Sequence, residues 1–474
     1  MEMSLKKKFI GDRSFYKKLL AIAVPIMVQN GISNFVNMLD NIMVGQTGTE
    51  QMSGVAIVNQ LLFVYYLCMF GGLAGAGIFT AQYYGIKDYE GVRTTFRYKF
   101  WLGIIIVTSA ILLFILHGEA LIHNYLLGSS DGGDLQLALS SGKSYLMIML
   151  IGLVPNMLLQ VYAGVLRECG ETVIPMKAGI TAVLVNLGLN YVLIYGHFGF
   201  PAMGVRGAAI ATVISRFVEL IIVLLWTKLH RERCEYLTGV FRTLKVPFDL
   251  VIKFFVTGAP LMVNETLWSA GVAVLTQSYS TRGMNVIAAQ NISNTISNVF
   301  NVVFFAMGDA IAIIVGQLLG AGKMKEARDT DNKIIAFAVF VGVLVGITVA
   351  ITAPFFPMIY KTTDEAKHLA TCFILCQAIF TPQMAFLHTT YFTLRSGGKT
   401  WITFIFDSVF MWVMSVPAAY ILCQKTSISV IWVFCIIQIL DWIKCIVGFV
   451  LVKNGIWMQN IVSKEKKILK YEKK

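Results

Sequence analysis

The stretch that decides the fold runs from Pro25 to Gly45 and reads PIMVQNGISNFVNMLDNIMVG. It continues an apolar helix that begins near Leu19 and is long enough to cross a membrane. Pro25 lies inside this helix, where it removes a backbone hydrogen bond and favours a bend. Polar residues then recur, beginning with Gln29, and four of them step by four, three and four to form a stripe along one face: Asn30, Asn34, Asn37 and Asn41. We expect the stripe to face an internal cavity.

Asp40 lies beside this polar stripe, late in the helix. A carboxylate within a lipid-embedded helix is costly, so it usually faces a cavity and has a function. The alternative is that Asp40 lies in a loop and caps the element that follows.

The composition of the chain indicates a polytopic membrane protein. Of its 474 residues, 57% are hydrophobic and 14% are charged, whereas a soluble chain carries about 25% charged residues. Twelve hydrophobic spans are each long enough to cross a bilayer core of about 30 Å. They lie near residues 19–41, 50–80, 98–117, 144–166, 173–195, 205–228, 251–278, 285–319, 334–354, 369–394, 401–423 and 428–452.

The net charge of +13 is explained by where the basic residues lie relative to the membrane, and it does not indicate a surface that binds nucleic acid. If the amino terminus is cytoplasmic, most of the 39 Lys and Arg residues lie in cytoplasmic loops and in the two tails. This is the positive-inside pattern. We therefore expect a multi-pass protein of the cell membrane with both termini cytoplasmic, in contact with membrane lipid and with no nucleic-acid partner.

An internal repeat organises the chain. The segment Pro25–Val28 corresponds to Pro260–Val263 at an offset of 235 residues, and later pairs are offset by 228. The remaining matches are Asn59 with Asn294, Gln82 with Gln317, Gly85 with Gly320, Arg93 with Arg328, Leu166-Arg167 with Leu394-Arg395, Gly170 with Gly398, and Thr172 with Thr400.

The repeat predicts an all-α membrane protein with twelve transmembrane helices in two six-helix bundles. An even number of spans in each half makes this a parallel repeat about an axis along the membrane normal. We expect an N-terminal lobe over 1–230, a cytoplasmic linker over 231–248, and a C-terminal lobe with a basic cytoplasmic tail over 249–474. The eight cysteines are scattered and contain no CxxC pair, which is typical of small apolar packing residues.

Ionisable groups inside the spans mark candidate sites. In the second half, Glu265 and Asp407 lie in different spans and could meet in an internal cavity with Asp309 and His388, exchanging protons or binding sodium through oxygen ligands. Each of these residues could instead be a hydrogen-bonded packing residue. Two further pairs are spaced i,i+3 and are expected to form structural ion pairs along one helix: Arg216 with Glu219, and Asp441 with Lys444.

Amide and hydroxyl groups in the first half form a second candidate set. Asn186 and Asn190 lie one turn apart on the fifth span, and Thr212 lies among small residues of the sixth span. Their oxygen atoms are suited to solvating a cation or to hydrogen-bonding a carboxyl group. No nucleotide-binding loop, HExxH motif or GxSxG elbow occurs, so we expect neither an enzyme nor a cofactor.

Several motifs resemble those of the multidrug and toxic compound extrusion (MATE) family of cation-coupled antiporters. They are DNIMVG at 40–45, LRECGETVIPM at 166–176, NLGLNYVLIYG at 186–196, GVRGAAIATVIS at 204–215, VGQLLGAG at 315–322 and LRSGGKT at 394–400. With the twelve spans and the repeat, the resemblance covers nearly the whole chain.

The resemblance implies two bundles around a central cleft for organic cations. It also implies a coupling-cation site at Asp40, Asn186, Asn190 and Thr212, with Gln29, Asn34 and Asn37 lining the substrate cavity. The family's fifth-helix aspartate is replaced here by Asn190. In the second lobe, Glu265 lies about a turn before the family's glutamate, the tenth-helix aspartate is absent, and Asp407 is the further candidate. The coupling ion is therefore left open between H+ and Na+, with Na+ bound at the coupling-cation residues.

The function that this resemblance implies is efflux of small organic cations by antiport, carried out by a monomer. The alternative is a flippase for lipid-linked substrates on a similar pair of bundles, which we expect to have a strongly basic cavity; only Arg216 and Lys444 supply cations well inside the spans. A membrane enzyme would need a clustered nucleophile or metal set. A channel is less consistent with duplicated helices that contain proline.

Overall fold

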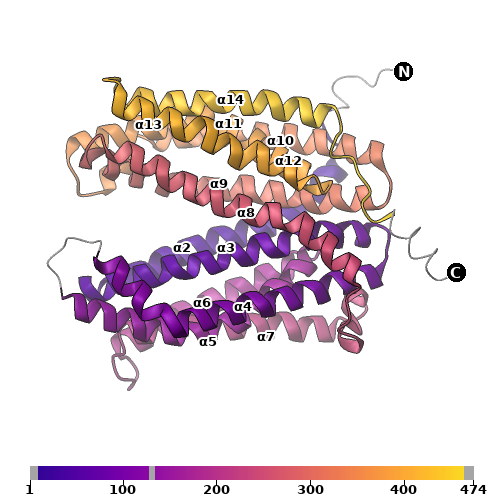
Figure 1. Ribbon diagram of the computed structural model, residues 1–474, viewed down its shortest axis with the longest axis horizontal. Coiled ribbons are helices and arrows are strands. Elements are labelled where there is room, and N and C mark those ends of the chain that lie inside the picture. The colour runs from indigo at the N-terminus through magenta and orange to yellow at the C-terminus, as the bar shows by residue number, and fades with distance from the viewer. Residues whose placement is uncertain (1–8, 128–133, 464–474) are drawn as a thin grey trace. The chain divides into compact units, whose positions relative to one another are not determined.

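The computed structural model describes residues 9–127 and 134–463 (Figure 1). Within these ranges the regular structure is entirely helical. Twelve helices of the described part of the chain are long and apolar enough to cross a membrane, which confirms the twelve predicted spans. The basic tail that we expect to be cytoplasmic lies largely outside the described residues.

The first six spans are single helices. They are α2 (Arg13–Gly45), α3 (Thr49–Gly85), α4 (Tyr89–Leu127), α5 (Leu135–Glu168), α6 (Val173–Tyr195) and α7 (Val205–Leu229). Two short 3-10 helices follow in the connecting segment, η1 (Glu235–Leu237) and η2 (Val240–Arg242). α2 continues through Pro25 and Asp40, so Asp40 is a helix residue and does not cap the next element.

The second six spans contain one irregular member. The regular ones are α8 (Phe248–Ser280), α9 (Met284–Gly320), α10 (Met324–Thr352), α11 (Asp364–Ser396) and α14 (Val430–Lys453), and η3 (Phe356–Ile359) precedes α11. The irregular span consists of α12 (Thr400–Phe404), η4 (Ile405–Val409), η5 (Met411–Ser415) and α13 (Val416–Lys425). Both η4 and η5 are wound as π-helix, a geometry that often marks functional sites.

The chain folds into two compact units. The N-terminal unit comprises residues 28–80 and 88–253, and the C-terminal unit comprises residues 9–27, 81–87 and 254–463. α2 therefore contributes its first part to the C-terminal unit and the part after Met27 to the N-terminal unit, and this change follows Pro25 by two residues. The division into lobes at 231–248 stays a prediction.

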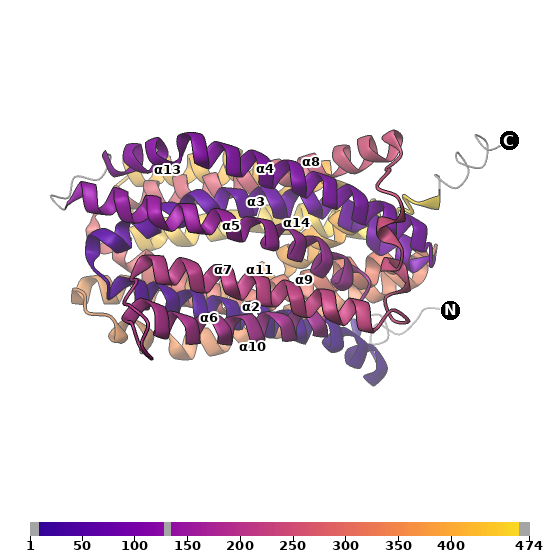
Figure 2. The same cartoon turned by 90° about the horizontal axis from the view of Figure 1, so that it is seen from below.

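Helices α4 to α7 form much of the N-terminal unit. α5 packs against α7 and α4, and α6 packs against α7 (Figure 2). Glycine allows close approach where α3 meets α5: a Cβ atom on Gly54 would overlap the backbone of α5 at Ala138. The hydroxyl of Tyr65 on α3 donates to the Leu153 carbonyl on α5 at 3.1 Å, which satisfies a polar group inside the bundle.

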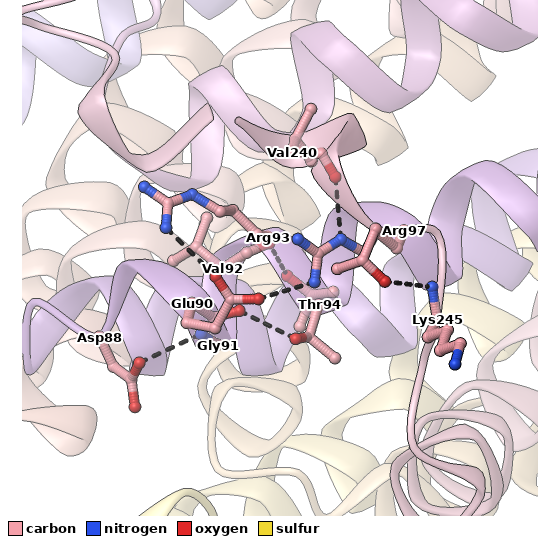
Figure 3. A network of polar contacts seen from close by, with 11 residues as sticks. Asp88, Glu90, Gly91, Val92, Arg93, Thr94, Arg97, Val240 and Lys245 are labelled. Carbon is pink, nitrogen blue, oxygen red and sulfur yellow. Dashed lines mark hydrogen bonds and ion pairs between the residues drawn. The ribbon is translucent and has the colours of Figure 1, made fainter. Parts of the chain in front are cut away.

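The segment after α7 docks on α4 through three residues spaced one turn apart, and Figure 3 shows the first two, Arg93 and Arg97. Arg93 Nη2 donates to the Glu235 carbonyl at 3.0 Å. Arg97 Nε donates to the Val240 carbonyl at 2.9 Å, and Trp101 Nε1 donates to the Leu244 carbonyl at 3.0 Å. Residues 235–244 of the expected linker are therefore fixed to the N-terminal unit.

In the C-terminal unit α11 lies at the centre of the packing. It contacts α9, α10 and α14, and all four helices are labelled in Figure 1. A buried apolar cluster includes Leu19 and Ile26 of α2 together with Ile311 of α9 and Ile334 of α10. The start of α2 is thus part of the core of this unit.

The end of α3 crosses the end of α9 within the C-terminal unit. A Cβ atom on Gly85 would overlap the Gln317 carbonyl, and one on Gly320 would overlap the Gln82 carbonyl. These four residues are two matched pairs of the sequence repeat. The Gln82 side chain also donates to the Ser396 and Gln459 carbonyls, at 3.2 and 3.1 Å, and so holds the segment in place.

Candidate functional site

Asp40, Asn186, Asn190 and Thr212 meet in one polar cluster of the N-terminal unit, which we call the Asp40 cluster. Asn190 Nδ2 donates to Asp40 Oδ1 at 2.6 Å and to Asn186 Oδ1 at 3.2 Å. Asn186 and Asn190 are only 5% and 1% exposed, and Asp40 is half-buried. The i,i+4 spacing on α6 thus brings both amides to the carboxylate of α2, as the sequence predicts.

The amide of Asn186 has two useful orientations in this cluster. In one, its Nδ2 donates to Thr212 Oγ1 at 3.3 Å. With oxygen and nitrogen exchanged, Nδ2 donates to both Asp40 oxygens, at 2.9 and 3.0 Å, and Oδ1 accepts from the Thr212 amide at 3.3 Å. The second orientation satisfies both ends of the amide, because in the first Oδ1 faces the Asp40 oxygens, which in a carboxylate only accept hydrogen bonds.

A second polar group lies one turn further along α7. Arg216 Nη1 pairs with Glu219 Oε2 at 3.1 Å, which confirms the pair predicted along this helix. Gly179 of α6 leaves room beside it, because a Cβ atom there would lie 3.1 Å from Gln29 Nε2 and 3.3 Å from Glu219 Oε1. Gln29 Oε1 is buried and has no hydrogen-bond partner among the described residues.

The three residues expected to line a substrate cavity differ in their placement. Gln29 points into the N-terminal unit near Gly179, as described above. Asn34 lies on the exposed face of α2. The side chain of Asn37 lies outside the described residues. The cavity itself remains a prediction.

A second cluster lies in the C-terminal unit around Asp407, and we call it the Asp407 cluster. Asn264 of α8 is 1% exposed and donates to Asp407 Oδ2 of η4 at 3.2 Å. Its Oδ1 accepts from the Ser408 hydroxyl at 2.7 Å. The hydroxyl of Tyr391 on α11 donates to Glu265 Oε1 at 3.2 Å and lies 3.4 Å from Asn264 Nδ2. Glu265 and Asp407 therefore belong to one hydrogen-bonded group.

Lys444 of α14 completes the Asp407 cluster. Its Nζ donates to Asp407 Oδ1 at 2.6 Å, and the ammonium lies 5.4 and 5.9 Å from the ring centroids of Phe406 and Phe410. The expected pairing of Lys444 with Asp441 along α14 is wrong, because the π-helical turn of η4 brings a carboxylate from the neighbouring span to the lysine. Aromatic rings beside the ammonium add a cation–π contribution to the same site.

Several participants in the Asp407 cluster were missed from sequence. Asn264, Tyr391 and Ser408 carry uncharged polar groups, and no helical periodicity distinguishes them from packing residues. The repeat held one usable signal, because Asn264 lies 235 residues after Gln29 and Lys444 lies 228 residues after Arg216. The first span of each half therefore carries an amide at equivalent positions, and the last span of each half carries a cation.

The other ionisable candidates of the second half do not all join this cluster. The ring of His388 packs edge-on against Phe305, with centroids 4.9 Å apart, and its Nδ1 lies 2.9 Å from the Met384 carbonyl. His388 is therefore a packing residue whose ring nitrogen contacts a backbone carbonyl of its own helix, α11. Among the residues that the structure describes, no group of three or more His, Cys, Asp or Glu residues is arranged to hold a metal ion.

Comparison with known families decides the kind of protein. The MatE family model matches the chain in two segments, residues 25–192 and 260–421. The chain belongs to the MATE family. The two matched segments follow the two halves of the internal repeat. Members of this family are multi-pass membrane transporters and not enzymes, which removes the membrane-enzyme alternative.

Relatives of this MATE protein span almost its entire length. The probable multidrug resistance protein NorM of Thermotoga maritima is 25% identical over 438 residues, covering 91% of each chain. The multidrug resistance protein PmpM of Pseudomonas aeruginosa is 25% identical over 414 residues, covering 86% of this chain and 84% of that protein. A solved variant of the Vibrio cholerae MATE transporter VcmN shares the fold with a TM-score of 0.82 at 16% identity, over 94% of this chain and 98% of that one.

Proposed function

We propose that this MATE protein exports small organic cations from the cell by antiport against H+ or Na+. The observation that carries the proposal is the environment of Asp40. Its contacts are neutral amide donors from α6, while the nearby Arg216 is engaged with Glu219. Among the described residues no cation forms an ion pair with Asp40, so the carboxylate is available to an ion that comes from solution.

The names of the relatives support the export of drugs. NorM of Thermotoga maritima and PmpM of Pseudomonas aeruginosa are both named multidrug resistance proteins. Carboxylates inside the spans, with few cations well away from the membrane surface, favour a positively charged substrate over a lipid-linked anion. We expect export by a monomer in the cell membrane, with both termini cytoplasmic, in line with the positive-inside pattern.

The way in which α2 is divided supports a coupling mechanism. The part before Met27 packs in the core of the C-terminal unit, and the part with Asp40 belongs to the N-terminal unit. Pro25 lacks the amide hydrogen that would hold the helix straight. A proton or Na+ that neutralises Asp40 changes the interactions of the second part of the helix, and bending at Pro25 lets that part move while the first part stays packed. Ion and drug then favour different shapes of one helix, which is what antiport requires.

The coupling residues take distinct roles in this proposal. Asp40 carries the charge, and Asn190 holds its carboxylate through the 2.6 Å hydrogen bond. Asn186 and Thr212 supply amide and hydroxyl oxygens, which are ligands that suit Na+ and that also stabilise a protonated carboxyl group. Glu265 and Asp407 form the secondary charged group of the other unit.

The experiment is transport of a fluorescent organic cation in proteoliposomes, with a pH gradient and a Na+ gradient imposed separately. We expect one gradient to drive uptake by the wild-type protein. Asp40→Asn fixes a neutral side chain and should abolish gradient-driven transport while fluorescence titration still detects binding of the cation.

The matched control is Glu326→Gln on the exposed start of α10, where the pair with Lys323 is more than half exposed on both sides. It makes the same acid-to-amide change outside any cluster and should leave transport unchanged. Full gradient-driven transport by Asp40→Asn at normal expression would refute the assignment of Asp40. Failure of both gradients with wild-type protein would refute antiport against H+ or Na+.

A further inference from the structure

Two cysteines that are far apart in sequence meet inside the C-terminal unit. Cys376 lies on α11 and Cys435 on α14, 59 residues later, and their Sγ atoms are 2.9 Å apart. Both are free thiols. A disulfide has sulfur atoms ~2.05 Å apart, so these thiols need to approach by less than about 1 Å to reach bonding distance.

The surrounding packing holds the two thiols together. Phe434 directly precedes Cys435, and Phe373 lies one turn before Cys376; their rings are stacked with centroids 4.7 Å apart. One residue beyond Cys376, the Gln377 side chain accepts a hydrogen bond of 2.6 Å from Ser297 of α9. α11 and α14 also pack directly against each other. The short sulfur–sulfur distance therefore belongs to a fixed helix crossing.

We propose that Cys376 and Cys435 are an oxidisable dithiol that forms a disulfide between α11 and α14. Cys435 is half-buried and offers the point of attack, whereas Cys376 is 4% exposed and is reached through its partner. Both cysteines lie in the halves of their helices next to residues 353–363 and 426–429. By the topology expected from the charge distribution, these connections are external, on the side of the membrane where disulfides persist.

The reaction is a thiol–disulfide exchange in two steps with a small apolar disulfide as oxidant. The Cys435 thiol loses its proton and attacks the oxidant, forming a mixed disulfide and releasing one thiolate. The Cys376 thiol then attacks the Cys435 sulfur, forming the Cys376–Cys435 bond and releasing the second thiolate. The two protons lost by the cysteines are taken up by the two leaving thiolates, so the oxidant is reduced by two electrons.

The disulfide would restrain the helices that carry the Asp407 cluster as well as the residues around the two cysteines. It would close the chain between α11, which carries Tyr391, and α14, which carries Lys444. The enclosed segment includes the π-helical turn with Asp407. Oxidation therefore restrains the two helices on either side of that turn without adding a bond to the N-terminal unit.

The test is performed on the full-length protein in detergent. The protein is treated with 4,4′-dithiodipyridine, remaining thiols are alkylated, and peptides are analysed by mass spectrometry with and without reductant. We expect a cross-linked pair of peptides that contains Cys376 and Cys435, and a higher midpoint of thermal unfolding after oxidation. Alkylation of both cysteines after treatment, or a cross-link of Cys435 to another cysteine in place of Cys376, would overturn the proposal.

Variants separate this site from general thiol chemistry. Cys435→Ala should abolish both the cross-link and the rise in the unfolding midpoint. The matched control is Cys372→Ala, since Cys372 lies one turn earlier on the same helix, is half-buried, and contacts His368 Nδ1 at 3.5 Å. It should keep the cross-link. The peptide analysis of the wild-type protein decides the question even if a variant fails to fold, and it does not depend on transport.

Discussion

The Asp407 cluster shares two repeat-related positions with the polar group of Gln29, Arg216 and Glu219 that lies beside the Asp40 cluster, and the two halves of the chain pair their carboxylates differently. Each unit places an amide on its first helix, Gln29 or Asn264, and a cation on its last helix, Arg216 or Lys444. In the C-terminal unit the cation pairs with Asp407 of a neighbouring span. In the N-terminal unit the position equivalent to Asp407 is Gly179, and the cation pairs with Glu219 of its own helix.

This difference separates a carboxylate that is already neutralised from one that is not. Asp407 has a lysine at 2.6 Å, so an ion from solution would have to displace Lys444. Asp40 has only side-chain amide groups as hydrogen-bond partners among the described residues. The difference supports our proposal that ions from solution exchange at Asp40, and it indicates that the Asp407 cluster is stabilised by its own ion pair.

Removing the lysine should produce the largest change in stability. The side chains of Lys444 and Asp407 are 12% and 18% exposed, and loss of one partner leaves a buried charge unpaired. We expect Lys444→Met to lower the free energy of unfolding by about 3–5 kcal/mol, measured by chemical denaturation in detergent. The double variant Asp407→Asn with Lys444→Met should recover most of the loss.

Lys323→Met is the matched control for this prediction. Lys323 and Glu326 are 58% and 56% exposed, so water replaces the interactions that each side chain loses. The loss of stability should be clearly smaller than for Lys444→Met. Equal losses at Lys323 and Lys444 would mean that burial of the Asp407–Lys444 pair adds nothing to its contribution.

A smaller effect is expected from Glu265→Gln. The amide keeps an oxygen that can accept the hydrogen bond from Tyr391, so the fold is retained and only the charge is lost. We expect export to fall by about 3- to 10-fold, because a hydrogen bond to a charged group contributes about 1 kcal/mol more than the neutral one that the variant keeps. Export assays at matched expression measure this. Unchanged export would make Glu265 a packing residue, and complete loss would give the second unit a coupling role equal to that of Asp40.

The smallest effect is expected from Asp441→Asn. Asp441 lies three residues before Lys444, but the lysine pairs with Asp407. We expect the free energy of unfolding to change by less than about 1 kcal/mol, and export to stay at the wild-type rate. A loss of stability comparable to that of Lys444→Met would mean that Asp441 helps Asp407 to neutralise the charge of Lys444.

Sequence reasoning succeeded where a property repeats along one helix. The twelve spans follow from hydrophobic length alone, and the Arg216–Glu219 pair follows from i,i+3 spacing. The Asn186–Asn190 spacing correctly placed both amides on one face of α6, and the late position of Asp40 in its span correctly made it a helix residue. Each of these features depends on a single helix and on a short list of residues.

Sequence reasoning failed where two helices must be placed side by side. Lys444 has an acidic neighbour at i−3, yet its partner lies on another span, and the π-helical winding that turns Asp407 towards it has no periodic signal. The contact between Cys376 and Cys435 has no sequence signal, because the two cysteines are separated by 59 residues. Helix packing, which depends on the fit of many side chains, decides both contacts.

The crossing of α3 and α9 carries a consequence for the origin of the chain. Gly85 meets the backbone at Gln317, and Gly320 meets the backbone at Gln82, so equivalent residues exchange equal contacts. Such reciprocity defines an isologous interface, the kind that two identical subunits form about a twofold axis. A half-length ancestor would have carried both sides of this contact on one surface and could pair with a copy of itself. Duplication of the gene for such an ancestor would make permanent, within one polypeptide, an association that otherwise depends on subunit concentration.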